Sequence, residues 1–328
     1  ESLQQAGYRT LGATANPNIN AYFQFDQGFD LYVDSGAVFR FMPGYKVSAR
    51  ALPEASELFA KLLAALDADE RRPVYLQVNL MEVHEASRAC GGIPDAAPTR
   101  ECYLDALRRL SRAVGAFLDT LLAKPGFENT LVAITSDHGE TLPGEHASLA
   151  DPRWHGHLVY PTHARVPWIL YDSSGRLPRG RVVEQPVRLL ELMPTLLELA
   201  DVPMPPGLAG RSLAPLLLGE RAVELPRRFV VESELRRARK IGIYDEGWLL
   251  VENRDGHPGT SPVELQRADG PCDGARSSRA AAEVERTRSL TEALARWEAS
   301  HPRRDPVPPS GPVDERTREQ LRALGYID

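Results

Sequence analysis

Short apolar runs alternate with longer stretches in which leucine recurs at helical spacing along much of this chain. The short runs predict strands over residues 8–13, 73–80, 130–135 and 166–171. The longer stretches predict helices over residues 55–67, 103–121 and 191–200. Strands that alternate with helices in this way are typical of α/β proteins.

The pattern changes after about residue 222. Residues 240–244 and 248–251 predict two antiparallel strands joined by a hairpin, and 229–231 a third strand. A helix is expected over 280–299, followed by a proline-rich extended linker and a short terminal helix. These features divide the chain into an α/β domain, a small C-terminal antiparallel-sheet and helix subdomain, and a linker with its terminal helix: 1–222, 223–300 and 301–328.

A cluster of acids and histidines directly follows the run 130–135, whose apolar, β-branched residues predict a buried parallel strand. Open α/β proteins place their sites at the carboxyl ends of such strands. Asp137 and His138 stand at this end, where a carboxylate oxygen and an imidazole nitrogen can bind one divalent cation. Six of the eight histidines fall in one quarter of the chain, namely His84, His138, His146, His155, His157 and His163. This clustering suggests a metal-dependent hydrolase or transferase.

Charge and composition exclude some classes of partner. The net charge is −6 and no basic patch with interleaved aromatic residues occurs, which argues against nucleic-acid binding. No stretch reaches the roughly 20 apolar residues of a membrane-spanning helix. Cys90, Cys102 and Cys272 lack the spacing of a metal knuckle and leave the redox compartment open. The chain begins with Glu1 instead of methionine, so the absence of a signal peptide carries no information.

Two segments match a known signature closely. Residues 129–140 contain the run Ser-Asp-His-Gly-Glu after a strand, and residues 75–84 form a strand that leads into His84. Further matching segments are Gly7–Thr10, Asn16–Pro17, Gly28–Asp30, Arg165–Pro167, Leu192–Leu197, Gly210–Leu213 and Leu321–Tyr326. In this order and spacing, the chain resembles the sulfatase family of the alkaline-phosphatase superfamily. The resemblance implies a mostly parallel central sheet with helices on both faces, and it makes residues 1–222 the catalytic domain.

The resemblance also implies roles for individual residues. Asp137 and His138 would supply two of the family's four metal ligands, and His84 would contact the ester oxygens or the leaving group. Ca²⁺ is the metal expected from the family, while the histidine-rich surroundings leave Mn²⁺ or Zn²⁺ open. The expected substrate is a sulfate ester or phosphoester, either a small molecule or a glycan. A periplasmic or extracellular location is expected on the same grounds.

One expected lysine is missing from this chain. Many sulfatases carry a sulfate-binding lysine near the segment that here reads His155-Gly-His157, but no lysine occurs between Lys124 and Lys240. A histidine at this place could bind a tetrahedral oxyanion or a second metal. We assign this role to His157, with His155 as the alternative. His146 is expected to order the surroundings of the metal ligands.

The nucleophile is the main departure from the family. Sulfatases convert a Cys or Ser in a Cys/Ser-x-Pro-x-Arg motif into formylglycine, and no such motif occurs in these residues. Cys272 opens an imitation of the motif, but Gly274 replaces its proline. We therefore expect that the chain lacks roughly its first hundred residues, judged against usual domain lengths. The missing part would contain the formylglycine and an upstream pair of metal-binding aspartates.

Two alternatives stay open at this point. One is a phosphoethanolamine- or phosphoglycerol-type transferase of the same superfamily, favoured by the missing lysine and the added histidines. The other is a degenerate relative without catalytic activity, against which the intact metal signature argues. The residues upstream of Glu1 would separate the three possibilities, because each uses a different nucleophile or none.

Overall fold

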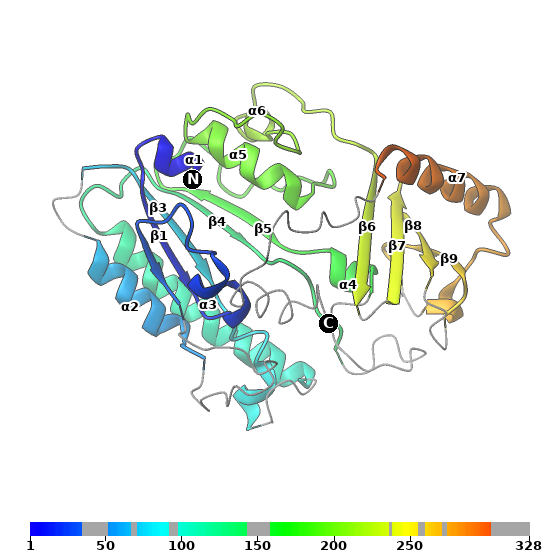
Figure 1. Cartoon of the computed structure of the whole chain (residues 1–328), viewed down its shortest axis with the longest axis horizontal. Coiled ribbons are helices and arrows are strands. Elements are labelled where there is room, and N and C mark those ends of the chain that lie inside the picture. Colours follow the sequence, from blue (N-terminus) through cyan, green and yellow to red (C-terminus); the bar gives the residue numbers. More distant parts are fainter. Residues whose placement is uncertain are drawn as a thin grey trace, which may run out of the picture.

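The computed structural model describes residues 1–34, 52–66, 71–91, 98–142, 158–235, 238–254, 260–270 and 274–302. Within these residues the strands form three sheets, and helices cover them from several sides (Figure 1). Parallel strands and packed helices occur together, which confirms the predicted α/β class. The short connecting 3-10 helices are Pro17–Ile19, Ala21–Phe23, Ala86–Cys90, Leu189–Glu191 and Gly274–Ser277.

The first sheet is parallel and has β1 at its centre. Its strands are β1 (Arg9–Thr14), β2 (Leu31–Val33) and β3 (Val74–Asn79). The short helix α1 (Ser2–Gln5) precedes β1, and α2 (Ala55–Ala65) and α3 (Arg100–Leu122) pack on this sheet. Phe59 of α2 stacks on Phe117 of α3 with ring centroids 4.2 Å apart. The leucines at helical spacing thus form the core between the helices and β1, as the sequence predicts.

The second sheet pairs β4 (Leu131–Thr135) with β5 (Trp168–Asp172) in antiparallel register. On one face Leu131 and Leu170 pack against α5 (Leu192–Leu199) and α6 (Ala214–Leu217). These two helices lie on the other side of the strands from α2 and α3 (Figure 1).

The opposite face of this sheet is open, since Ile134 is 38% exposed and Ile169 is 55% exposed. The prediction of a buried parallel strand over 130–135 is therefore wrong for the described residues in both burial and pairing. The strand itself forms where predicted, because β-branched and apolar residues favour it. Apolar composition shows which side chains prefer burial, but it does not show whether a second layer covers them.

The third sheet is antiparallel, with its strands in the order of the sequence. They are β6 (Arg228–Leu235), β7 (Ala238–Asp245), β8 (Trp248–Asn253) and β9 (Val263–Arg267). The predicted hairpin forms, and Glu246 and Gly247, which both have positive φ, make its two-residue turn.

Side chains alternate along β7 between the two faces of this sheet. Ile241 and Ile243 pack with α7 (Val284–Ser300), whereas Tyr244 faces residues 158–160 and α4 (Pro161–Ala164) on the other side. One face of the C-terminal sheet therefore supports the short segment that leads into α4, which becomes important for the site described below.

Candidate active site

Asp137 and His138 lie in the loop that leaves the carboxyl end of β4, as the sequence predicts. Their side chains are 73% and 41% exposed, and Asp137 Oδ2 lies 3.8 Å from His138 Nε2. His138 Nδ1 lies 2.8 Å from the carbonyl oxygen of Gly139. Because a carbonyl can only accept a hydrogen bond, this contact places the ring proton on Nδ1. The lone pair then belongs to Nε2, which is on the side of the carboxylate.

The loop backbone is held by its own polar groups and by α4. The Ser136 hydroxyl donates to the carbonyl of His138 at 2.6 Å. The amide of Gly139 donates to the carbonyl of His163 at 2.8 Å. His163 is 6% exposed, and its Nε2 lies 2.6 Å from the hydroxyl of Thr141. Two contacts with one residue of α4 therefore fix the loop just after the candidate metal ligands.

Gly139 is required here by space. A Cβ on this residue would overlap the carbonyl oxygen of Thr162 in α4. The φ of Gly139 is not in the left-handed region, so close packing is the reason for a glycine. The close approach of the loop to α4 therefore accounts for this glycine.

His84 lies in the turn after β3. Glu82, another polar residue of this turn, makes a contact that holds the backbone. A Glu82 carboxylate oxygen accepts a hydrogen bond from the amide of Ala55, at the first turn of α2. The N-cap residue of this helix, Glu54, makes no such bond with its own side chain. Glu82 therefore caps α2 in its place, and its charge opposes the positive end of the helix dipole. This contact fixes the backbone two residues before His84.

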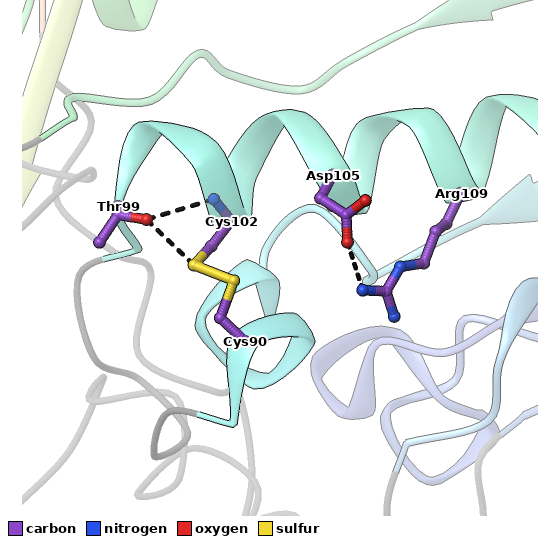
Figure 2. Close-up of a disulfide and its surroundings, with 5 residues drawn as sticks. All are labelled: Cys90, Thr99, Cys102, Asp105 and Arg109. Carbon is purple, nitrogen blue, oxygen red and sulfur yellow. Dashed lines mark hydrogen bonds and ion pairs between the residues drawn. A yellow bond between two sulfur atoms is a disulfide. The ribbon is translucent and has the colours of Figure 1, made fainter.

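Two residues in the first turn of α3 interact with the segments that follow His84 and His138. Cys102 forms a disulfide with Cys90, in the 3-10 helix after His84 (Figure 2). The next residue, Tyr103, has a raised pKa because of burial and, to a lesser extent, the nearby charge of Glu140. Since Glu140 follows His138 by two residues, the end of α3 that is bonded to Cys90 also feels the charge of the Asp137 loop.

The structure describes some of the predicted site residues and not others. Asp137 and His138 are adjacent with their side chains near one another, and His84 lies in the turn after β3, a strand of another sheet. Their assigned roles stay predictions. His157, like His146 and His155, lies outside the described residues. Among the described residues, no group of three or more metal-ligating side chains comes together.

Sequence reasoning missed several residues that shape this site. Glu82, Tyr103 and the disulfide cysteines carry no motif that distinguishes them, because their contacts join segments far apart in the chain. The sequence assigns no role to His163, because its contact with Thr141 depends on how α4 packs against the loop after β4. The described residues also contain no helix of the length and apolar character needed to cross a bilayer.

The fold is that of the alkaline-phosphatase-like α/β proteins. It is similar to a phosphonate monoester hydrolase from Silicibacter pomeroyi, with a TM-score of 0.66, 19% identity, and coverage of 91% of this chain and 79% of that chain. It is also similar to a structure in complex with its substrate D-glucosamine-2-N,6-O-disulfate, with a TM-score of 0.63, 15% identity, and coverage of 91% of this chain and 81% of the other.

Sequence comparison identifies the family within this fold. The sulfatase family model matches residues 1–202, which is more than half of the chain, so the chain belongs to the sulfatase family. An arylsulfatase from Clostridium perfringens is 30% identical over 121 residues, which cover 36% of this chain and 24% of that protein. The chain thus matches well under two thirds of the length of this curated relative.

Proposed function

We propose that this chain carries the metal-binding and ester-contacting part of a metal-dependent hydrolase of sulfate esters. The observation that carries the proposal is the pair at the end of β4, where the Asp137 carboxylate and His138 Nε2 lie 3.8 Å apart. Membership of the sulfatase family supports the same class of reaction.

The chemistry of the two side chains fits a divalent cation. Asp137 offers an exposed carboxylate, and His138 offers a nitrogen whose lone pair is fixed by the contact between Nδ1 and the Gly139 carbonyl. A bound cation would polarise the ester and stabilise negative charge that develops on its oxygens. Carboxylate oxygen suits Ca²⁺, the first candidate, while imidazole nitrogen suits Mn²⁺ or Zn²⁺.

Two histidines are assigned to the ester itself. His84 follows β3 and is proposed to contact the ester oxygens or to protonate the leaving oxygen. His157 is proposed to bind the transferring group in place of the family's lysine, because residues 125–239 contain none. The proposed substrates are sulfate esters of small molecules or of sugars. A sulfated glucosamine is the substrate bound in one protein of similar fold.

The nucleophile is proposed to come from outside these 328 residues. Formylglycine requires a Cys/Ser-x-Pro-x-Arg motif, and these residues contain none. The Cys90–Cys102 disulfide also withdraws both of its thiols from nucleophilic chemistry. We therefore expect no hydrolysis of aryl sulfates by these 328 residues alone.

Phosphoester transfer is the second candidate function. The interval without lysine removes the usual sulfate-binding cation, and a phosphonate monoester hydrolase has a similar fold. This candidate would use His157 to bind a second metal.

The test uses the longest natural form of the protein, coexpressed with the enzyme that produces formylglycine. Hydrolysis of an aryl sulfate and of an aryl phosphate is measured for wild type, Asp137→Asn, His157→Ala and His157→Lys. Metal-dependent sulfate hydrolysis that is lost in Asp137→Asn and in His157→Ala but kept in His157→Lys supports the first candidate. Phosphate hydrolysis with metal loss in His157→Ala supports the second. Full sulfatase activity in Asp137→Asn would contradict the proposed metal site.

A further inference from the structure

We propose that Tyr160 and Glu264 are positioning residues for the loop that carries Asp137 and His138. The buried contact between them connects the C-terminal sheet to α4, and α4 holds the loop. This inference rests on the proposed function only in taking that loop as the metal site.

The contact is a short hydrogen bond between two fully buried side chains. Tyr160 Oη donates to Glu264 Oε2 at 2.6 Å, and both residues are 0% exposed. The other carboxylate oxygen accepts from Asn253 Nδ2 at 3.0 Å. Asn253 Oδ1 in turn accepts from Lys240 Nζ at 3.0 Å, and Lys240 is 2% exposed. Tyr160 is thus bonded to a buried polar network in which both oxygens of the carboxylate have partners.

Burial raises the pKa of Glu264, and the hydrogen bond from Tyr160 and the charge of Lys240 act in the opposite direction. Removal of the tyrosine hydroxyl would leave a buried carboxylate oxygen without its donor. Such losses are costly inside a protein, because water cannot replace the missing donor. The network therefore favours one orientation of the Tyr160 side chain, which apolar packing alone would not specify.

The path from Tyr160 to the loop consists of backbone hydrogen bonds. The Tyr160 carbonyl accepts from the amides of His163 and Ala164, at 2.9 Å each. The His163 carbonyl then accepts from the Gly139 amide at 2.8 Å. Gly139 follows His138 directly, and its close packing on Thr162 leaves little room for α4 to shift independently.

A second contact holds the same segment against the sheet. The Tyr244 hydroxyl of β7 donates to the Val159 carbonyl at 2.8 Å. Gly242 on the same strand faces Val159, where an added Cβ would lie 3.1 Å from the valine side chain. The backbone before α4 is thus held at Val159 and Tyr160. The hydroxyl of Tyr160 is the contact that can be removed most conservatively.

The experiment compares Tyr160→Phe and Glu264→Gln with wild type in the full chain. Thr195→Val is the matched control, because it also removes a buried hydroxyl. This hydroxyl lies in α5 and accepts from the Leu213 amide at 2.9 Å. Amide hydrogen exchange is measured at Gly139 and His163, and at β1 residues as an internal reference. Binding of Ca²⁺ and of Mn²⁺ is measured by calorimetry.

We expect Tyr160→Phe and Glu264→Gln each to accelerate exchange at Gly139 and His163 by about tenfold relative to β1, the size expected from one buried hydrogen bond. Metal affinity should fall in both variants, because a loop that opens more often holds its two ligands in place for a smaller fraction of the time. The double variant should add little to either single variant, because both substitutions weaken the same contact. Thr195→Val should leave the ratio of Gly139 to β1 exchange unchanged.

Equal acceleration at Gly139 and β1 in both variants would overturn the proposal, because it would show only a general loss of stability. The variants could accelerate exchange only at Gly139 and His163 while the wild-type chain binds neither Ca²⁺ nor Mn²⁺. That result would support the positioning role and contradict the proposed metal function. Metal binding that is unaffected by either variant, with unchanged exchange, would overturn the positioning role alone.

Discussion

Cys102 in the first turn of α3 is covalently joined to Cys90, six residues after His84 (Figure 2). Thr99 caps the same turn by accepting a hydrogen bond from the Cys102 amide at 3.2 Å. The disulfide therefore links the 3-10 helix that directly follows the turn of His84 to a helix of 23 residues. The large helix limits the movement of that turn.

Reduction of this disulfide should destabilise the chain by about 3 kcal/mol, the value typical for a closed loop of this size. Chemical unfolding with and without reductant measures the difference. Cys90→Ser should lower the unfolding free energy by a similar amount and abolish the response to reductant. Cys272→Ser is the control and should keep the response. Equal unfolding free energies for oxidised and reduced wild type would contradict this prediction.

The sequence predicts the helices and strands better than it predicts the side-chain contacts between distant segments. Elements with a clear period, such as α2 and α3, form within a few residues of their predicted ranges, because the spacing of Leu58 and Leu62 determines a helix face. The strand β9 was missed, since Val263–Arg267 is short and contains three polar residues. One of these is Glu264, whose burial depends on hydrogen-bond partners from two other segments.

The candidate site was predicted only in part for a similar reason. Asp137 and His138 are adjacent in sequence, so their proximity follows from the motif. The disulfide and the proximity of Tyr103 to Glu140 depend on how α3 packs across two loops. No spacing in a single sequence reports contacts of that kind. The exposure of β4 has the same origin, because it depends on a covering layer and not on the residues of the strand.

Asp137→Asn should abolish metal binding and leave the fold intact. The carboxylate is 73% exposed, so we expect the unfolding free energy to change by less than about 0.5 kcal/mol. Affinity for Ca²⁺ or Mn²⁺ should fall more than about 100-fold, because even outer-shell partners contribute 10- to 100-fold. Calorimetric titration together with thermal unfolding checks both parts.

His138→Ala should behave in the same way, and Asp119→Asn serves as the control because it removes an exposed carboxylate of α3. If both Asp137→Asn and His138→Ala retain wild-type affinity, the metal site lies elsewhere in the chain.

The ion pair between Glu298 of α7 and Arg254, the residue directly after β8, should make stability depend on pH. A hydrogen bond from Arg254 lowers the pKa of Glu298 below its usual value of 4.5, against the opposing effect of burial. Because the pKa of Glu298 is lower in the folded state, the stabilisation from this pair is complete above pH 4.5. It is lost as the pH falls through the pKa of the folded state. Glu298→Gln should remove this part of the acid sensitivity, at most about 1 kcal/mol.

Urea unfolding of wild type and Glu298→Gln across acidic pH measures this contribution. Glu292→Gln removes an exposed carboxylate from the same helix and controls for the change in net charge. Parallel pH curves for wild type and Glu298→Gln would show that the pair contributes nothing to acid stability.

Gly139→Ala should disturb the loop after β4, although alanine is acceptable for the backbone conformation at this position. The new methyl group would overlap the Thr162 carbonyl, so α4 or the loop has to move, at a cost of roughly 1–3 kcal/mol. Gly115→Ala is the matched control. It lies within α3 with no atom near its added methyl group, and it should stabilise the chain by about 0.5–1 kcal/mol. Thermal unfolding gives both changes, and hydrogen exchange at the amide of residue 139 reports whether its bond to the His163 carbonyl is kept. An equal gain of stability in the two variants would mean that α4 does not pack on Gly139 as described.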